Sequence, residues 1–307
     1  MTSSHAAAYA GALRAAREAN AGQNYPPGAL YMVATPIGNL ADITLRALHV
    51  LQLADTLACE DTRHTQALLR AYGIEKAAAQ WFSLHQHNEA QATQTVLERL
   101  RLGQRVAYVS DAGTPAISDP GARLAAAARA DALRVIPLPG ASSVTAALSV
   151  AGVAADADGS DGFVFAGFLS SKAGERSRAV EALRLEKRAV VLLEAPHRIE
   201  ALADALNTLG ERQITVAREL TKQFEEIQSL GAVDFPAWLA ADPNRLRGEF
   251  VVVLHPASAA LPEQPDERVL KLLLAELPLK SAVKLAAEIT GAPRNRLYEM
   301  ALRLKTD

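Results

Sequence analysis

Four short segments of the sequence combine acidic, hydroxyl-bearing and small residues in a way that could build a binding site. Each follows directly on a short apolar run that predicts a β-strand. In an open parallel sheet, ligands bind outside the carboxyl ends of the strands, so segments in this position are the first candidates for chemistry. The four are TPIGNL (35–40), CEDTRHT (59–65), SDAGTPAISDPG (110–121) and LPGASSVTAAL (138–148).

The segment 110–121 holds two Asp, two Pro and two Gly, which is more than a turn requires. Asp111 comes at the end of the predicted strand, where its carboxylate can accept hydrogen bonds from an amine or a hydroxyl group. The alternative is an Asx-turn in which Ser118 and Asp119 cap the next helix. We favour a functional role for this segment.

The other three segments also leave two interpretations open. In 35–40, Gly38 lets the backbone approach a ligand closely, or it only turns the chain. In 138–148, Ser142 and Ser143 stand at a helix start, where unpaired N–H groups accept an anion or a polar group; capping alone would explain one serine. In 59–65, the charged residues form either a functional cluster or an exposed ion-pair network: Glu60, Asp61, Arg63 and His64.

Short apolar runs alternate with helical patterns along the chain, which predicts βαβ units and an α/β fold with mainly parallel sheets. Runs such as RVAYVS and LRVIPLP place a first α/β domain at 28–152. Runs such as AVVLLEA and GEFVVV place a second, of four or five strands, at 160–258. The residues 266–307 predict a small helical tail. The Ala-rich residues 1–27 predict a disordered or loosely helical extension.

The composition excludes several classes of protein. Half of the 307 residues are hydrophobic and the formal net charge is −2, so any nucleic-acid contact needs a local basic patch. The single cysteine, Cys59, cannot form an internal disulfide, which is typical of a reducing, cytoplasmic compartment. The sequence shows no apolar run long enough to span a membrane. We expect no metal site at His85 and His87, which are better suited to polar contacts with substrate or solvent.

Taken in order, these segments resemble the tetrapyrrole methylase (class III) superfamily of S-adenosylmethionine-dependent methyltransferases. Within it, the chain is similar to the family that methylates the 2′-oxygen of a cytidine in small-subunit ribosomal RNA. The resemblance covers residues 30–255 and extends into the tail. It rests on VATPIGNLADIT, CEDTRHT, SDAGTPAISDPG, LPGASSVTAAL, FAGFL, EAPHRI, ARELTKQFEE and GEFVVV.

The resemblance implies that S-adenosylmethionine binds in a cleft between the two α/β domains. The first domain would contribute the loops after three strands, and the second domain would close the cleft through Phe168 or Leu169 and two further backbone segments. The residues implied are Pro36, Ile37, Gly38, Asp111, Thr114, Ser142, Ser143, Phe168, Leu169, Ala217 and Gly248. The family also implies a homodimer that acts on the assembled small ribosomal subunit.

Transfer to a ribose 2′-hydroxyl needs a group that takes its proton or stabilises the growing oxyanion. Glu60 or Asp61 is the candidate base, and Arg63 or Lys222 the candidate electrostatic support; the sequence does not choose among them. RNA would need a basic surface that the net charge hides. The candidates are Lys172, Arg176, Arg178, His197, Arg198, Lys280, Lys284, Arg294 and Arg296.

The chain departs from the family pattern at three places. Ser170 stands where the family has a proline, and residues 1–27 and the acidic stretch AADADGSDG (154–162) are additions. Two other functions stay open: a class III methyltransferase acting on a tetrapyrrole or a protein, and a ribosome-assembly factor that kept the fold without catalysis.

Overall fold

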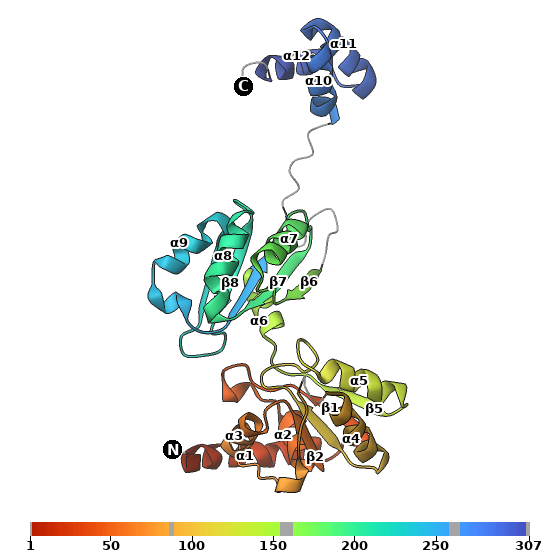
Figure 1. Cartoon of the computed structure of the whole chain (residues 1–307), viewed down its shortest axis with the longest axis vertical. Coiled ribbons are helices and arrows are strands. Elements are labelled where there is room, and N and C mark those ends of the chain that lie inside the picture. Colours follow the sequence, from red (N-terminus) through yellow and green to blue (C-terminus); the bar gives the residue numbers. More distant parts are fainter. Residues whose placement is uncertain (1, 86–88, 154–161, 258–264, 305–307) are drawn as a thin grey trace.

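The computed structural model describes residues 2–85, 89–153, 162–257 and 265–304. Two α/β domains are followed by a helical C-terminal unit, which confirms the predicted fold class (Figure 1). The acidic stretch expected between the α/β domains lies almost wholly outside the described residues, as do 258–264 before the C-terminal unit. Within the described part of the chain, no helix is both long and apolar enough to cross a membrane.

The first domain is built on a five-stranded sheet whose strands are all parallel. The order is β3-β2-β4-β1-β5, so β4 and β1 lie in the middle. β1, β2 and β4 are buried along their whole length, which explains their continuous apolar runs. The strands are β1 (Ala29–Val33), β2 (Thr56–Cys59), β3 (Trp81–Ser83), β4 (Val106–Val109) and β5 (Arg134–Leu138).

Helices cover both faces of this sheet. The helices α2 (Leu45–Leu53) and α3 (Thr62–Ala71) pack in one apolar cluster with outward side chains of β1 and β2. The helices α4 (Glu89–Arg101) and α5 (Gly121–Ala130) contribute to a second cluster on the other face. The N-cap of α2 is Thr44, whose hydroxyl accepts from the Ala47 amide at 3.1 Å.

The N-terminal extension is an ordered helix, α1 (Thr2–Asn20), which corrects the expectation of a disordered or loosely helical segment. Leu13 and Ala16 are buried in the same cluster as α2 and α3. The ring of Tyr9 packs edge-on against Tyr72, the C-cap residue of α3, with ring centroids 4.9 Å apart. Among the described residues of α1, Tyr9, Ala12, Leu13 and Ala16 pack on this cluster, and the two alanines carry little sequence signal for burial.

The second sheet is mixed, in the order β6-β7-β10-β8-β9. β6 and β7 are parallel, but β10 is antiparallel to β7 and β8, and β8 is antiparallel to β9. The prediction of a mainly parallel sheet was therefore wrong for this domain. The loop between β8 and β9 is too short for a crossover, so these two strands must be antiparallel. The strands are β6 (Phe163–Gly167), β7 (Ala189–Glu194), β8 (Gln213–Arg218), β9 (Glu226–Gly231) and β10 (Phe250–Leu254).

One helix links the two sheets. α6 (Ser143–Ala151) begins just after β5 of the first sheet, and its Val144, Ala147 and Ala151 pack on strands of the second sheet. The opposite face of that sheet packs against α8 (Ile199–Asn207) and α9 (Phe235–Ala240), with α7 (Ala173–Leu183) beside them. The start of α6 is therefore held at the boundary between the domains.

The C-terminal unit has its own apolar core. It consists of α10 (Pro265–Glu276), α11 (Leu279–Thr290) and α12 (Arg294–Arg303), in agreement with the predicted helical tail. Leu270, Val283 and Leu297 are buried where the three helices meet. The unit is thus held together by contacts among its own helices.

The packing of α1 predicts a measurable contribution to stability. Leu13→Ala should lower the free energy of unfolding by about 2–3 kcal/mol, because it removes a buried side chain from the shared cluster. The neighbouring, exposed Arg14→Ala should change it by less than about 0.5 kcal/mol. Urea denaturation of both variants checks this, and equal stabilities would mean that α1 is not docked.

Candidate functional site

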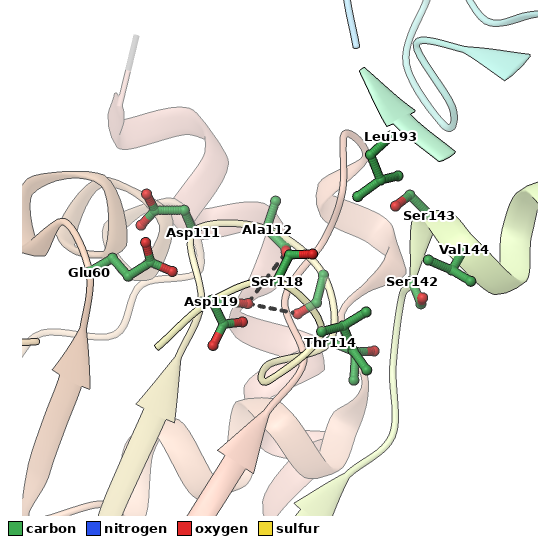
Figure 2. Close-up of a pocket in the computed structure, with 13 residues that line it drawn as sticks. Glu60, Asp111, Ala112, Thr114, Ser118, Asp119, Ser142, Ser143, Val144 and Leu193 are labelled. Atoms are coloured by element: carbon green, nitrogen blue, oxygen red, sulfur yellow. Dashed lines mark hydrogen bonds between the residues drawn. The ribbon is translucent and has the colours of Figure 1, made fainter. Parts of the chain in front are cut away.

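A cleft lies between the two α/β domains, at the carboxyl ends of the first sheet's strands. It consists of two cavities, of 180 and 370 Å³, that share Ala112, Ser143 and Leu193 as lining residues. Figure 2 shows the carboxyl groups of Glu60 and Asp111 on one side of the smaller cavity, Ser142 and Ser143 on the other, and Leu193 of the second domain beside them. Carboxylate and hydroxyl side chains line the smaller cavity beside Ile117, Val144 and Leu193, whereas the lining of the larger cavity is mostly apolar.

The loop 110–121 forms the floor of the smaller cavity and is held by its own hydrogen bonds. The Ser110 hydroxyl donates to the Gly113 carbonyl at 3.1 Å. Asp119 accepts from the Tyr108 hydroxyl at 3.1 Å and from the Ala116 amide at 2.8 Å. Asp119 therefore stabilises the turn of its own loop, as expected of an Asx-turn residue. Asp111 is the exposed carboxylate of the loop.

Two further contacts connect this loop with its neighbours. One carboxylate oxygen of Asp111 accepts from the Asp61 amide at 3.4 Å, which links the loop to the segment 59–65. The Thr114 hydroxyl donates to the Ala141 carbonyl at 3.0 Å, which links it to the start of α6. Thr114, predicted to bind the cofactor, lines the cavity and also joins two of the loops that form it.

The two serines at the start of α6 line the smaller cavity (Figure 2). Ser142 is the N-cap of α6, yet its side chain makes no capping hydrogen bond. Because the Ser142 hydroxyl makes no hydrogen bond to its helix, it can bind a ligand instead. The amide groups of the first turn of α6 add a partial positive charge at the same point.

Glu60 and Asp61 are adjacent in sequence but lie in different environments. Glu60 lines the cavity, and its burial, together with the charges of Asp111 and Asp119, raises its pKa to about 7. Asp61 is the N-cap of α3 and pairs with Arg63 at 2.9 Å. Hydrogen bonds from Arg63 hold the pKa of Asp61 at about 2. A carboxyl group that titrates near neutrality suits proton transfer, and a permanently ionised one does not.

Arg63 and Lys222, the candidates for electrostatic support, are both engaged with carboxylates. The Arg63 side chain is 90% exposed and reaches no further than Asp61. The Lys222 ammonium lies 2.8 Å from Glu219 and 3.0 Å from Glu249. Burial opposes the charge of Lys222, but its hydrogen bonds to both carboxylates outweigh burial and raise its pKa. Neither cation lines the smaller cavity.

The sequence suggested that Gly38 lets the backbone approach a ligand, but in the structure it lies against a loop of the second domain. A Cβ atom at this position would lie 2.4 Å from Cγ of Lys222 and 3.0 Å from the Leu220 carbonyl oxygen. The missing side chain therefore makes room for a loop of the second domain. Thr221 in that loop has a positive φ of 65°, which adds backbone strain at the contact.

Only some of the other predicted cofactor residues line the cleft. Ile37 and Phe168 line the larger cavity. Pro36 and Ala217 are buried, and Leu169 packs in the core of the second domain. Gly248, at φ 88°, lines a separate cavity beside Arg218 and Glu226.

Several lining residues of the second domain were not predicted. Leu193, Pro196, Leu220 and Val251 give the larger cavity its apolar wall. They fall in or beside the strings EAPHRI, ARELTKQFEE and GEFVVV, which were recognised without a role for each residue. Their apolar character is typical of strand ends, so no residue type marked them as part of a site.

A buried carboxylate stands behind this wall. The side chain of Glu194 is 1% exposed and accepts from the Ala195 amide at 2.9 Å. It pairs at 3.1 Å with Arg198, whose guanidinium also donates to the Leu169 carbonyl oxygen. Arg198, a candidate RNA-binding residue, is therefore engaged inside the second domain.

The remaining RNA-binding candidates are mostly at the surface. On α7, Lys172 and Arg178 are exposed, whereas Arg176 is half-buried and donates to the Ser170 and Ser171 carbonyls. Ser170, the departure from the family pattern, accepts from the Lys172 amide and binds Glu175, and so helps to start α7. The other candidates are exposed: His197, and Lys280, Lys284, Arg294 and Arg296 in the C-terminal unit.

The chemistry of the cleft fits S-adenosylmethionine. The smaller cavity is lined by the carboxylates of Glu60, Asp111 and Asp119 and by no lysine or arginine, which suits a ligand with a sulfonium and an ammonium group. The larger, apolar cavity suits a purine ring. Among the described residues, no cluster of His, Cys, Asp or Glu could hold a metal ion; His87 lies outside them.

The raised pKa of Glu60 predicts how stability depends on pH. The ordinary pKa of glutamate is about 4.3, so between about pH 4.3 and 7 the folded protein binds more protons at Glu60 than the unfolded chain does. The free energy of unfolding therefore falls as pH rises through this window. Glu60→Gln should match the wild type below about pH 4.3 and exceed it at about pH 8 in urea denaturation.

Asp61→Asn is the matched control, because Asp61 has the opposite shift. Its ionised form stabilises the folded protein above the ordinary pKa of aspartate, so this variant should be less stable than the wild type at neutral pH. Equal stability of Glu60→Gln and wild type at about pH 8 would show that Glu60 ionises as it does in water.

Comparison with known proteins identifies the family. The family model of tetrapyrrole (corrin/porphyrin) methylases matches residues 29–233, and that of the RsmI C-terminal HTH domain matches residues 259–305. The chain is 47% identical to the ribosomal RNA small subunit methyltransferase I of Escherichia coli O157:H7 over 279 residues, which cover 90% of this chain and 95% of that protein. Its counterpart in Neisseria meningitidis serogroup A is 49% identical over 282 residues, covering 91% and 94%.

A solved structure supports the fold. The uroporphyrin-III-C-methyltransferase of Thermus thermophilus matches with a TM-score of 0.52 at 22% identity, over 77% of this chain and 98% of that one. S-adenosylmethionine, the cofactor expected from the sequence, is the methyl donor of this family. The chain therefore belongs to the tetrapyrrole methylase family and, within it, to the ribosomal RNA small subunit methyltransferases I.

Proposed function

We propose that this protein transfers a methyl group from S-adenosylmethionine to the ribose 2′-oxygen of a cytidine in small-subunit ribosomal RNA. The observation that carries the reaction type is Glu60, a half-buried carboxyl group in the interdomain cleft whose pKa is raised to about 7. The names of the relatives support ribosomal RNA as the substrate. The resemblance of the sequence motifs supports the cytidine 2′-oxygen as the acceptor.

The cofactor would lie along the cleft and use both cavities. Asp111 would accept from its ammonium group, and Ser142 with the first turn of α6 would hold its carboxylate. Ile37, Leu220 and the wall near Leu193 would enclose the adenosine. Because Glu60 lines the same cavity as Asp111 and Ser142, its carboxyl group would lie near the methionine part of the bound cofactor.

S-adenosylmethionine supplies a methyl group that is activated by positive sulfur, so the main task of the protein is alignment, which can contribute roughly 7–11 kcal/mol. The 2′-oxygen of the ribose would form the new bond to the methyl carbon as the carbon–sulfur bond breaks. Glu60 would accept the hydroxyl proton and release it to water after product leaves. Asp61 would position this segment by capping α3 and presenting its amide to Asp111.

Substrate RNA would be held outside the acidic cavity. Lys172, Arg178 and His197 are exposed on the second domain. The C-terminal unit adds Lys280, Lys284, Arg294 and Arg296, and its match to an HTH domain model fits a role in contacting nucleic acid. We further propose that the protein works in the cytoplasm as a homodimer on the small ribosomal subunit.

Isothermal titration with S-adenosylmethionine tests the cofactor assignment. The wild type should bind one cofactor per chain. Asp111→Ala should raise the Kd by about 10-fold or more, because it removes a charged hydrogen bond, and Ser142→Ala by roughly 2- to 10-fold. Ser142 makes no capping hydrogen bond, so its replacement should not unfold α6.

Ser149→Ala is the control, because Ser149 lies on the same helix and is exposed outside the cleft. Its Kd should equal that of the wild type. If the wild type binds no cofactor, the protein does not act alone as a methyltransferase, and a non-catalytic assembly role takes its place.

The pH dependence of turnover tests the choice of base. With small subunits as acceptor, kcat should rise with pH through about pH 7, as the carboxyl group of Glu60 ionises. Glu60→Gln should lower kcat by about 10²- to 10⁴-fold and remove this dependence. Asp61→Asn, with a cap of similar strength, should keep most of the turnover. A larger loss in Asp61→Asn than in Glu60→Gln would assign the base to Asp61.

A further inference from the structure

Two exposed apolar side chains, one from each α/β domain, line the two cavities of the cleft. Ile117, in the loop 110–121 of the first domain, is 43% exposed and lines the smaller cavity. Phe168, just after β6 of the second domain, is 53% exposed and lines the larger cavity. Neither side chain has a role in the proposed methyl transfer, although the resemblance implied a cofactor contact for Phe168 or Leu169.

The backbone brings these two residues to the same place. A Cβ atom at Gly167, the neighbour of Phe168, would lie 4.0 Å from the hydroxyl oxygen of Ser118, the neighbour of Ile117. Gly167 has a positive φ of 63°, so the chain turns there as it leaves β6. The segments that carry Ile117 and Phe168 therefore lie close together.

The residues next to Phe168 and Ile117 are fixed by packing and hydrogen bonds. After Phe168, Leu169 is buried in the core of the second domain, and its carbonyl accepts from Arg198, which is paired with buried Glu194. On the other wall, Ala116 has a positive φ of 69° and its amide donates to Asp119 at 2.8 Å. The exposure of the two apolar groups is thus built into ordered loops on both sides.

We propose that Ile117 and Phe168 form the subsite for the target base, which stacks between them when the nucleotide is turned out of the RNA. Proteins that act on a nucleotide hold the extruded base between aromatic and apolar side chains. Such a base would bring its ribose into the cavity that contains Glu60. This inference rests on the proposed function, because it needs a nucleotide as the substrate.

The neighbouring polar group fits the same occupant. Ser118 is exposed, lines the cavity of Glu60, and carries a hydroxyl that can donate or accept one hydrogen bond. A pyrimidine presents both donors and acceptors on its edge, so Ser118 can contact it while Ile117 and Phe168 cover its faces. The subsite combines stacking with a polar contact to one edge of the base.

Steady-state methylation of unmethylated small subunits tests the subsite. Phe168→Ala should lower kcat/KM by roughly 5- to 100-fold, the loss expected when base stacking is removed. Phe168→Trp should restore most of it, because a larger ring still stacks. Titration with S-adenosylmethionine should give Phe168→Ala the Kd of the wild type. Ile117→Ala should show a smaller loss of the same kind.

Phe163→Ala is the matched control. Phe163 stands at the opposite end of the same strand and is 47% exposed, so its replacement should change neither kcat/KM nor the cofactor Kd. An unchanged kcat/KM in Phe168→Ala overturns the subsite. So does an equal loss of cofactor affinity, which would assign Phe168 to the adenine of the cofactor.

The failure of the proposed function gives a different result. In that case the wild type itself would bind S-adenosylmethionine but leave the small subunit unmethylated, and the subsite for a nucleotide base would fall with it. Active wild type together with an unaffected Phe168→Ala contradicts the subsite alone.

Discussion

The close contact at Gly38 is the constraint on which the cleft depends. The first domain can meet the second only because no side chain stands where the stem of Lys222 and the carbonyl of Leu220 approach. Lys222 is in turn fixed by Glu219 and Glu249, so the loop that fills this space is held by two ion pairs. An alanine at Gly38 would have to separate the two walls of the cavities.

Two neighbouring carboxyl groups of the first domain have opposite electrostatic surroundings. Glu60 is half-buried beside Asp111 and Asp119 of its own domain, which raises its pKa. Asp61, one residue further along, is exposed and is kept ionised by its pairing with Arg63. These surroundings produce one carboxyl group suited to proton transfer and one suited to capping a helix.

The functional residues divide between the domains by their chemistry. The first domain brings polar groups together at the carboxyl ends of parallel strands, as its βαβ pattern requires. The second domain contributes mainly apolar walls and a mixed sheet, in which β10 runs between β7 and β8. Exposed cations lie on α7 and in the C-terminal unit, away from the acidic cavity. This separation would let the phosphates of the RNA bind outside the cavity whose carboxylates would repel them, while the target ribose enters it.

The sequence by itself determined the α/β class, the parallel first sheet and the loops that line the cavity, because strand runs and strand-end residues are local signals. It did not show that α1 is docked, since the alanines on its packed face carry little signal, or that the second sheet is mixed, since pairing direction depends on distant strands. Only the tertiary structure separated Glu60 from Asp61 and assigned Lys222, Leu169 and Arg198 to packing and ion pairs. Burial and charge proximity decide those roles, and both arise only when segments far apart in the chain meet.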